Sequence, residues 1–405
     1  MSALSFLADP ARRNVAVLAA AQALFHSTQT MTIATTPLAA YAMLGPDEKI
    51  WATVPIFLAH VGLMCTTLPA ALLMGRIGRR PGFSLGATIG IVGGLVSFAG
   101  IWWQSFVLLC VGGLLQGSSA AFAWHYRFAA TDVADASFKA KAISLVLAGG
   151  VAAGFLGPQM AKWSVDLLHP VVFAGVYLAI SVTAAIVLVL MQLIQIPTPA
   201  KTDTGAGGRP MGEIMRQPVF IAAAMSSMIG YAVMTLVMSA TPLAMFGCGL
   251  GFADSATVIQ VHVLAMFVPA FFTGNLINRF GAGPIVLTGA VIEIACALTN
   301  LTGVSFWHFA IANLFVGLGW NFCYVGGTTL LTTAYRQEER AKVQGTHDFM
   351  VYATTALAAG TSGTLQAQAG WSALNMVAIP ALLLLIAVVA WFTRRPVPHP
   401  VSAVS

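Results

Sequence analysis

Apolar runs of about twenty residues follow one another along almost the whole sequence. Only 8% of the 405 residues are charged, whereas a soluble domain carries about 25%, so the chain cannot cover a water-facing surface. A run of this length is long enough to cross a bilayer as a helix. We therefore expect an all-α membrane protein with twelve transmembrane helices, near 14–43, 51–75, 83–103, 106–127, 139–164, 170–194, 218–246, 256–278, 284–303, 306–334, 343–368 and 370–393.

The basic residues are divided unequally between the two ends of these expected helices. Lys49 and Lys162 fall at one end, whereas sixteen Lys and Arg residues fall in loops at the other end. Basic loops remain on the cytoplasmic side, so we expect a multi-pass protein of the bacterial inner membrane with both termini in the cytoplasm. The same asymmetry explains the net charge of +6 without a nucleic-acid partner.

One long polar stretch, residues 197–216, divides the expected helices into two groups of six. Its Pro, Gly and Thr content predicts a flexible cytoplasmic linker. We therefore expect an N-terminal bundle over 1–196 and a C-terminal bundle over 217–405.

The two groups of helices carry related sequences. Segment 60–64 recurs at 262–266 with an offset of 202, and the Arg-x-Gly of 76–78 recurs at 279–281 with an offset of 203. Six helices per copy would give both copies the same orientation. Such a duplication predicts two pseudo-symmetric six-helix bundles with a substrate site between them, near the middle of the membrane.

Two neighbouring expected helices each carry a pair of possible metal ligands. Met234 and Met238 are four residues apart, as are His262 and Met266. This spacing places each pair on one helical face. Because the two helices run in opposite directions, the pairs would lie at similar depths. Thioether sulfur and imidazole nitrogen suit a soft cation such as Cu(I), although methionines also fill gaps in a core and a histidine can be a structural hydrogen-bonding group.

The frequency of such pairs helps to decide between a metal site and a structural role of these residues. The chain's composition gives about 0.3 His-x-x-x-Met pairs by chance, and two occur, at equivalent points of the repeat. The second pair, His60 and Met64, is either a weaker ligand pair on the metal path or a remnant of duplication. Cys248, just past the helix 218–246, is the cysteine best placed for redox or metal chemistry at the outer face.

Several other ionisable residues fall within the apolar runs, where they are costly. His347 and Asp348 indicate proton coupling, or a gate or ion pair near the cytoplasmic end. His26, His125 and Arg127 are candidates for the lining of a central cavity. No nucleotide-binding loop, His-rich loop or Ser–His–Asp arrangement occurs in the sequence, so we expect neither a primary pump nor an enzyme.

The loop after helix 51–75 resembles the signature of the major facilitator superfamily, Gly-x-x-x-Asp-Arg-x-Gly-Arg-Arg. Here the segment reads Ala-Leu-Leu-Met-Gly-Arg-Ile-Gly-Arg-Arg over 71–80, so the basic part is kept and Gly75 replaces the aspartate. The resemblance covers the whole chain. It implies the major facilitator fold and secondary transport by alternating access.

A narrower resemblance concerns the four candidate ligands. Met234-x-x-x-Met238 together with His262-x-x-x-Met266 is similar to the motif pair of the CcoA-type copper importers, a group that also includes riboflavin transporters without these motifs. The resemblance implies copper import through the four residues and a role in supplying a haem–copper cytochrome oxidase. Copper would be the transported substrate of a monomer in the lipid bilayer, with no permanently bound cofactor. The alternatives are a transporter of a small organic solute such as riboflavin, and a membrane sensor or assembly factor.

Overall fold

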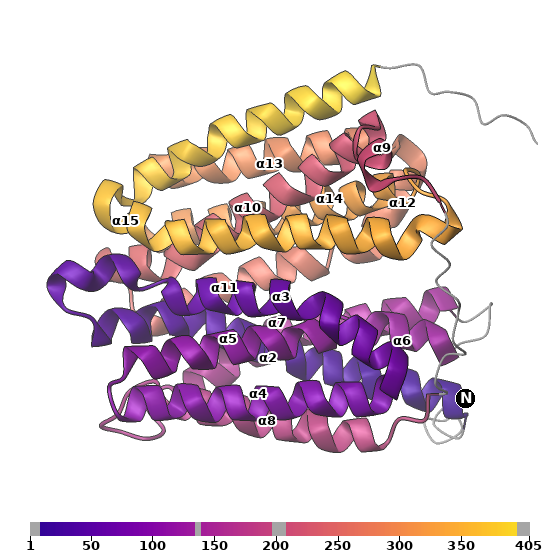
Figure 1. The fold of residues 1–405 in the computed structure, drawn as a ribbon. Coiled ribbons are helices and arrows are strands. Elements are labelled where there is room, and N and C mark those ends of the chain that lie inside the picture. Colours follow the sequence, from indigo (N-terminus) through magenta and orange to yellow (C-terminus); the bar gives the residue numbers. More distant parts are fainter. Residues whose placement is uncertain (1–8, 134–138, 197–207, 395–405) are drawn as a thin grey trace, which may run out of the picture.

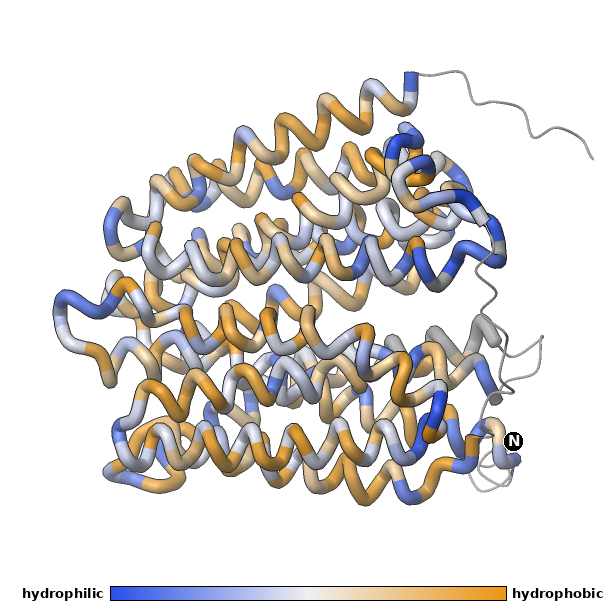
Figure 2. Tube along the Cα trace, in the orientation of Figure 1, coloured by the Kyte–Doolittle hydropathy of each residue, from blue (hydrophilic) through white to orange (hydrophobic). Residues whose placement is uncertain are grey.

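The structure is a computed structural model that describes residues 9–133, 139–196 and 208–394. Helices lie in two bundles, one formed by α2 to α8 and the other by α10 to α15 (Figure 1). We call the helix ends that carry Arg79, Arg209, Arg279 and Arg394 the basic end, and those near Lys49 and Lys162 the opposite end. Figure 2 shows apolar residues along the helices of both bundles and hydrophilic residues gathered mainly at the helix ends.

The first bundle contains six long helices and two short ones. They are α2 (Pro10–Met43), η1 (Pro46–Trp51), α3 (Val54–Ile77), α4 (Arg79–Trp102), α5 (Phe106–Ala123), α6 (Tyr126–Val133), α7 (Lys139–Ser164) and α8 (Ala174–Gln192). The second bundle follows the short α9 (Met211–Met215). Its elements are α10 (Pro218–Gly247), α11 (Phe252–Phe267), α12 (Ala270–Phe280), α13 (Ala282–Thr302), α14 (Phe306–Leu331), η2 (Gln337–Glu339) and α15 (Arg340–Thr393).

These elements confirm the predicted twelve-helix arrangement. Among the described residues, eight helical segments are long and apolar enough to cross a membrane, and the bent pair α11–α12 makes a ninth. One of the eight, α15, contains two crossings, because Gly370 has a φ of 81° inside it and the chain turns back there (Figure 1). The remaining two crossings are α2 and α7, which have 34 and 26 residues.

The structure differs from the predicted spans at two places. The predicted helix 256–278 is broken between α11 and α12, which meet at 42°. Pro269 lies at the break, and a proline can neither donate to the carbonyl one turn back nor fit its ring against that turn. The predicted helix 106–127 ends at Ala123, and α6 begins at Tyr126.

The described part of the predicted linker is attached to the second bundle. Arg209 donates from its backbone N–H and its guanidinium to the carboxylate of Glu339, with Nη2 and Oε2 2.7 Å apart. Residues 197–207 lie outside the described residues. Arg209, within the predicted linker, is thus bonded to the second bundle, and the predicted domain boundaries stay a prediction.

Candidate functional site

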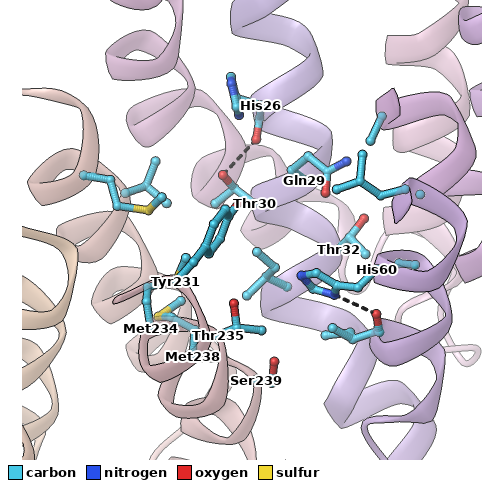
Figure 3. A pocket seen from close by; sticks show the side chains of 18 of the residues that line it. His26, Gln29, Thr30, Thr32, His60, Tyr231, Met234, Thr235, Met238 and Ser239 are labelled. Carbon is cyan, nitrogen blue, oxygen red and sulfur yellow. Dashed lines mark hydrogen bonds between the residues drawn. The ribbon is translucent and has the colours of Figure 1, made fainter. Parts of the chain in front are cut away.

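A cavity of about 120 Å³ lies between the two bundles. This is room for several water molecules. The lining comes from α2, α3 and α5 on one side and from α10 and α11 on the other. The described residues that line it include no Asp, Glu, Lys or Arg; they are His26, Gln29, Thr30, Thr32, Ile33, Ile56, Ala59, His60, Leu63, Gly117, Ala120, Trp124, Tyr231, Met234, Thr235, Met238, Ser239, His262, Val263, Met266 and Phe267. Figure 3 shows this cavity from close by.

The α2 side of the cavity is polar, yet its hydroxyl groups are satisfied within the helix. Thr30 Oγ1 donates to the His26 carbonyl at 2.9 Å, and Thr32 Oγ1 donates to the Thr28 carbonyl at 2.9 Å. Such bonds to a carbonyl one turn back let threonines lie at membrane depth without an unpaired donor. This explains how α2 can face the cavity with a polar surface inside a membrane.

The His26 ring is already engaged by its neighbours. Its Nε2 lies 2.7 Å from the Gln22 side-chain nitrogen, and its ring centre lies 5.4 Å from Trp124 and 4.8 Å from Phe267. Since an amide nitrogen donates, Nε2 of His26 acts as the acceptor here. His26 therefore contributes a packed wall of the cavity rather than a free ring nitrogen.

The four candidate ligands of the second bundle line this same cavity. Met234 and Met238 come from consecutive turns of α10, as Figure 3 shows, and His262 and Met266 come from α11. Met234 is 7% exposed, Met238 3% and His262 2%. The sequence spacing of four thus brings three sulfur atoms and one imidazole to a single buried space.

The position of α11 relative to α14 fixes the His262 ring. His262 Nδ1 lies 3.1 Å from the Asn313 carbonyl oxygen. A carbonyl only accepts, so Nδ1 carries the hydrogen, and in the neutral ring Nε2 keeps its lone pair. Metal-ligating histidines are commonly oriented by such a bond from the other ring nitrogen.

Helix α14 also holds the backbone of Met266. Asn321 on α14 donates from its side-chain nitrogen to the Met266 carbonyl at 2.8 Å and accepts from Thr273 Oγ1 at 2.7 Å. These bonds cross the break between α11 and α12. Two asparagines of α14 thus position both candidate ligands of α11.

The repeated pair in the first bundle is split by the structure. His60 lines the cavity, and its Nδ1 lies 3.0 Å from the Ile56 carbonyl oxygen on its own helix. Met64 is absent from the cavity lining described above and packs, partly buried, against the core. Only the histidine of this pair faces the candidate ligands of α10 and α11.

The other predicted site residues do not line this cavity. His125 Nδ1 lies 3.0 Å from the Ala121 carbonyl oxygen, and His347 Nδ1 lies 3.2 Å from Asp348 Oδ1. Cys248 is exposed and follows the end of α10 at the opposite end. These residues are therefore separate from the group of sulfur and imidazole donors.

Arg127 joins the two bundles between the cavity and the basic end. Its guanidinium lies 4.8 Å from the centre of the Phe128 ring and reaches the Tyr324 hydroxyl of the second bundle. At the opposite end, Lys162 Nζ donates to Thr257 Oγ1 at 2.8 Å. Polar contacts between the bundles are thus present on both sides of the cavity.

Sequence reasoning did not identify the hydroxyl and amide groups of the lining. Gln29, Thr30 and Thr32 come from α2, and Thr235 and Ser239 come from α10. A signal was present, because the polar residues of α2 recur at helical spacing within an apolar run. Within the described residues no group of three or more His, Cys, Asp or Glu could hold a metal.

Comparison with known proteins matches this chain to membrane transporters. Residues 15–292 and 258–404 match the profile of the Major Facilitator Superfamily. The chain is 39% identical to riboflavin transporter RfnT of Brucella anthropi over 94% of this chain and 95% of that protein. It is 29% identical to the MFS-type transporter YdeG of Bacillus subtilis over 88% of this chain and 86% of that protein.

Solved transporter structures share the fold. The nucleoside transporter NupG has a TM-score of 0.71 at 12% identity, over 94% of this chain and 99% of its own. The fucose:proton symporter FucP of E. coli has a TM-score of 0.63 at 13% identity, over 96% of this chain and 100% of its own. At these identities the likeness concerns the fold alone.

Proposed function

The chain belongs to the major facilitator superfamily and is a multi-pass membrane transporter, and from this premise we propose that it imports copper. The proposal rests on one observation, that Met234, Met238, His262 and Met266 line a single buried cavity between the bundles. We place the protein in a bacterial inner membrane with the basic end in the cytoplasm. It would act as a carrier, with no enzymatic step.

The chemistry of the lining favours a soft cation. Methionine sulfur is a neutral ligand that suits Cu(I) and binds without losing a proton, unlike a thiol. Hard cations such as Mg²⁺ and Ca²⁺ need several oxygen ligands, usually including carboxylates. No carboxylate is present among the described lining residues. Neutral ligands also bind a cation loosely enough to release it, which transport requires.

The proposed path follows the depth of the ligands. Met238 and His262 lie nearer the opposite end, and Met234 and Met266 lie one turn deeper along their helices. Copper would bind at the first level, exchange to the second, and leave after the bundles rock open at the basic end. An inside-negative membrane potential favours cation entry by about 2.3 kcal/mol per 100 mV for each charge.

Copper uptake into proteoliposomes under reducing conditions tests this proposal. We expect Met234→Ile and His262→Gln each to lower the initial rate at least about tenfold, because a lost ligand costs more than the 1.4 kcal/mol that a tenfold change represents. Met376→Ile, an exposed methionine of α15, is the matched control and should behave as wild type. Wild-type rates in both ligand variants, at equal protein content, would refute copper transport.

A second candidate substrate is riboflavin, since the relative that is 39% identical over 94% of the chain is a riboflavin transporter. That relationship supports an organic solute more directly than it supports copper. The cavity also offers aromatic rings, those of Trp124, Tyr231 and Phe267, on which a flat ring system could stack.

Binding to the purified protein separates the two substrates. Flavin fluorescence quenching that is unaffected by Met234→Ile and lost in Tyr231→Ala would support riboflavin. Copper binding that is lost in Met234→Ile, without flavin binding in the wild type, would support copper.

A further inference from the structure

We infer that His60 of the first bundle is a ligand of the same ion, so that bound copper joins the two bundles. This inference rests on the proposed copper transport and extends it. The motif residues Met234, Met238, His262 and Met266 all belong to the second bundle. A ligand from α3 would make ion binding depend on how the bundles are arranged.

His60 faces the motif residues across the cavity. It lines the same space of about 120 Å³ as Met234, Met238 and His262. Figure 3 shows its ring pointing from α3 into the cavity, toward the side where α10 presents Met234 and Met238. Side chains of both walls thus border one continuous space.

The ring of His60 is oriented for coordination. Its Nδ1 must donate, because its partner at 3.0 Å is the Ile56 carbonyl oxygen. In the neutral ring, Nε2 then carries a free lone pair. His262 has the same arrangement, with the Asn313 carbonyl as the partner of Nδ1. Two imidazoles that line one cavity, one from each bundle, therefore each keep a lone pair on Nε2.

Contacts at the opposite end hold α3 against the second bundle. The Gly363 backbone N–H of α15 donates to Thr53 Oγ1, which precedes α3, at 3.1 Å. Gly360 of α15 faces the Phe57 ring so closely that an added Cβ would lie 2.9 Å from it. These contacts must break for the opposite end to open, and His60 would then move away from the second bundle.

It follows that the coordination of copper differs between states. With the opposite end closed, both imidazoles and the methionine sulfurs are available. With that end open, only the ligands of the second bundle remain together. A ligand that binds one state more tightly shifts the population toward that state, so copper would favour closure of the outer mouth.

X-ray absorption of the Cu(I)-loaded full-length protein in lipid nanodiscs tests the inference. We expect two nitrogen ligands in the wild type and one in His60→Gln, with Cu(I) affinity at least about tenfold lower by chelator competition. His125→Gln is the matched control, since His125 also bonds to the carbonyl one turn back but does not line the cavity. It should keep both nitrogens and the wild-type affinity.

His60→Met extends the test should His60→Gln fail to fold. In His60→Met, one sulfur ligand of copper should replace one of the two nitrogen ligands, and the Cu(I) affinity should be restored. A structural role of the imidazole would not predict this result. If His60→Gln or His60→Met keeps two nitrogens and wild-type affinity, His60 is not a ligand, even though copper binding depends on His262. If the wild type binds no Cu(I), the proposed function itself fails.

Discussion

The two copies of the His-Val-x-x-Met segment, one in α3 and one in α11, occupy different environments. His60 bonds to a carbonyl of its own helix, whereas His262 bonds to a carbonyl of α14. Met64 and Met266 both pack, partly buried, against the core, but only Met266 also lines the cavity. The spacing is the same in both copies, so the surrounding helices decide which side chains reach the cavity.

The break after α11 accounts for part of this difference. Pro269 separates α11 from α12 with a bend of 42°, whereas α3 continues through Pro69 as one helix. The Met266 carbonyl near the break accepts from Asn321 of α14. In the second bundle, contacts between helices therefore set the positions of the candidate ligands.

The strongest test of this contrast compares the two methionines. We expect Met266→Ile to lower copper uptake at least about tenfold, because it removes a sulfur ligand. Met64→Ile should leave uptake within about twofold of wild type, since a hydrophobic exchange of similar size is tolerated in a core. Initial rates in proteoliposomes of equal protein content measure both. Equal losses in the two variants would mean that the copies contribute alike.

Each copy also meets a glycine of a helix that packs against it, Gly117 in α5 and Gly317 in α14. An added Cβ would lie 1.7 Å from the Ala59 carbonyl oxygen at the first crossing and 2.6 Å from the His262 carbonyl oxygen at the second. We expect Gly117→Ala and Gly317→Ala each to destabilise the protein by about 1–3 kcal/mol through overpacking. Gly117→Ala should have the larger effect.

Unfolding midpoints in detergent measure this prediction. Gly345→Ala on α15 is the control, because nothing lies within 4 Å of the Cβ it would add. If Gly117→Ala is as stable as Gly345→Ala, the crossing of α3 and α5 is looser than the structure shows.

The next effect concerns polar contacts between helices in the two copies. Asn321→Leu leaves the partly buried Met266 carbonyl without this donor, and we expect a loss of about 1–3 kcal/mol. Ser118→Ala removes the part-buried bond that Thr66 Oγ1 of α3 donates to Ser118 Oγ of α5 at 3.1 Å. We expect its effect to be smaller, below about 1 kcal/mol. Unfolding midpoints in detergent measure both variants. A larger loss of stability in Ser118→Ala than in Asn321→Leu would argue against the role given to Asn321.

The sequence predicted the twelve crossings because bilayer thickness fixes the length of an apolar run. The spacing of four also predicted that each candidate ligand pair lies on one face of its helix, because this spacing is a local property. It did not predict the separation of Met64 from His60, nor the exclusion of His125 and Arg127 from the lining. Those outcomes depend on which helices pack side by side, and spacing along a single helix carries no such information.

The smallest expected effect concerns the ion pairs at the basic end of the two bundles. In the first bundle, Arg79 Nε lies 3.0 Å from Asp132 Oδ2, with both side chains partly exposed. In the second, Arg209 bonds to Glu339, whose side chain is fully buried among protein atoms. Surface ion pairs contribute about 0–1 kcal/mol, so we expect Arg79→Gln to change the unfolding midpoint little.

The second ion pair should make stability depend on pH. The guanidinium of Arg209 and the backbone N–H of Arg336 hold the pKa of the Glu339 carboxyl well below its usual 4.5. A carboxyl whose pKa is lower in the folded state stabilises the protein above its unfolded pKa, and this contribution is lost as the pH falls below that value. We therefore expect Glu339→Gln to lower the unfolding midpoint near neutral pH, with the difference from wild type shrinking as the pH falls below about 4.5. A difference that stays constant with pH would show that Glu339 acts through its shape and hydrogen bonds rather than through its charge.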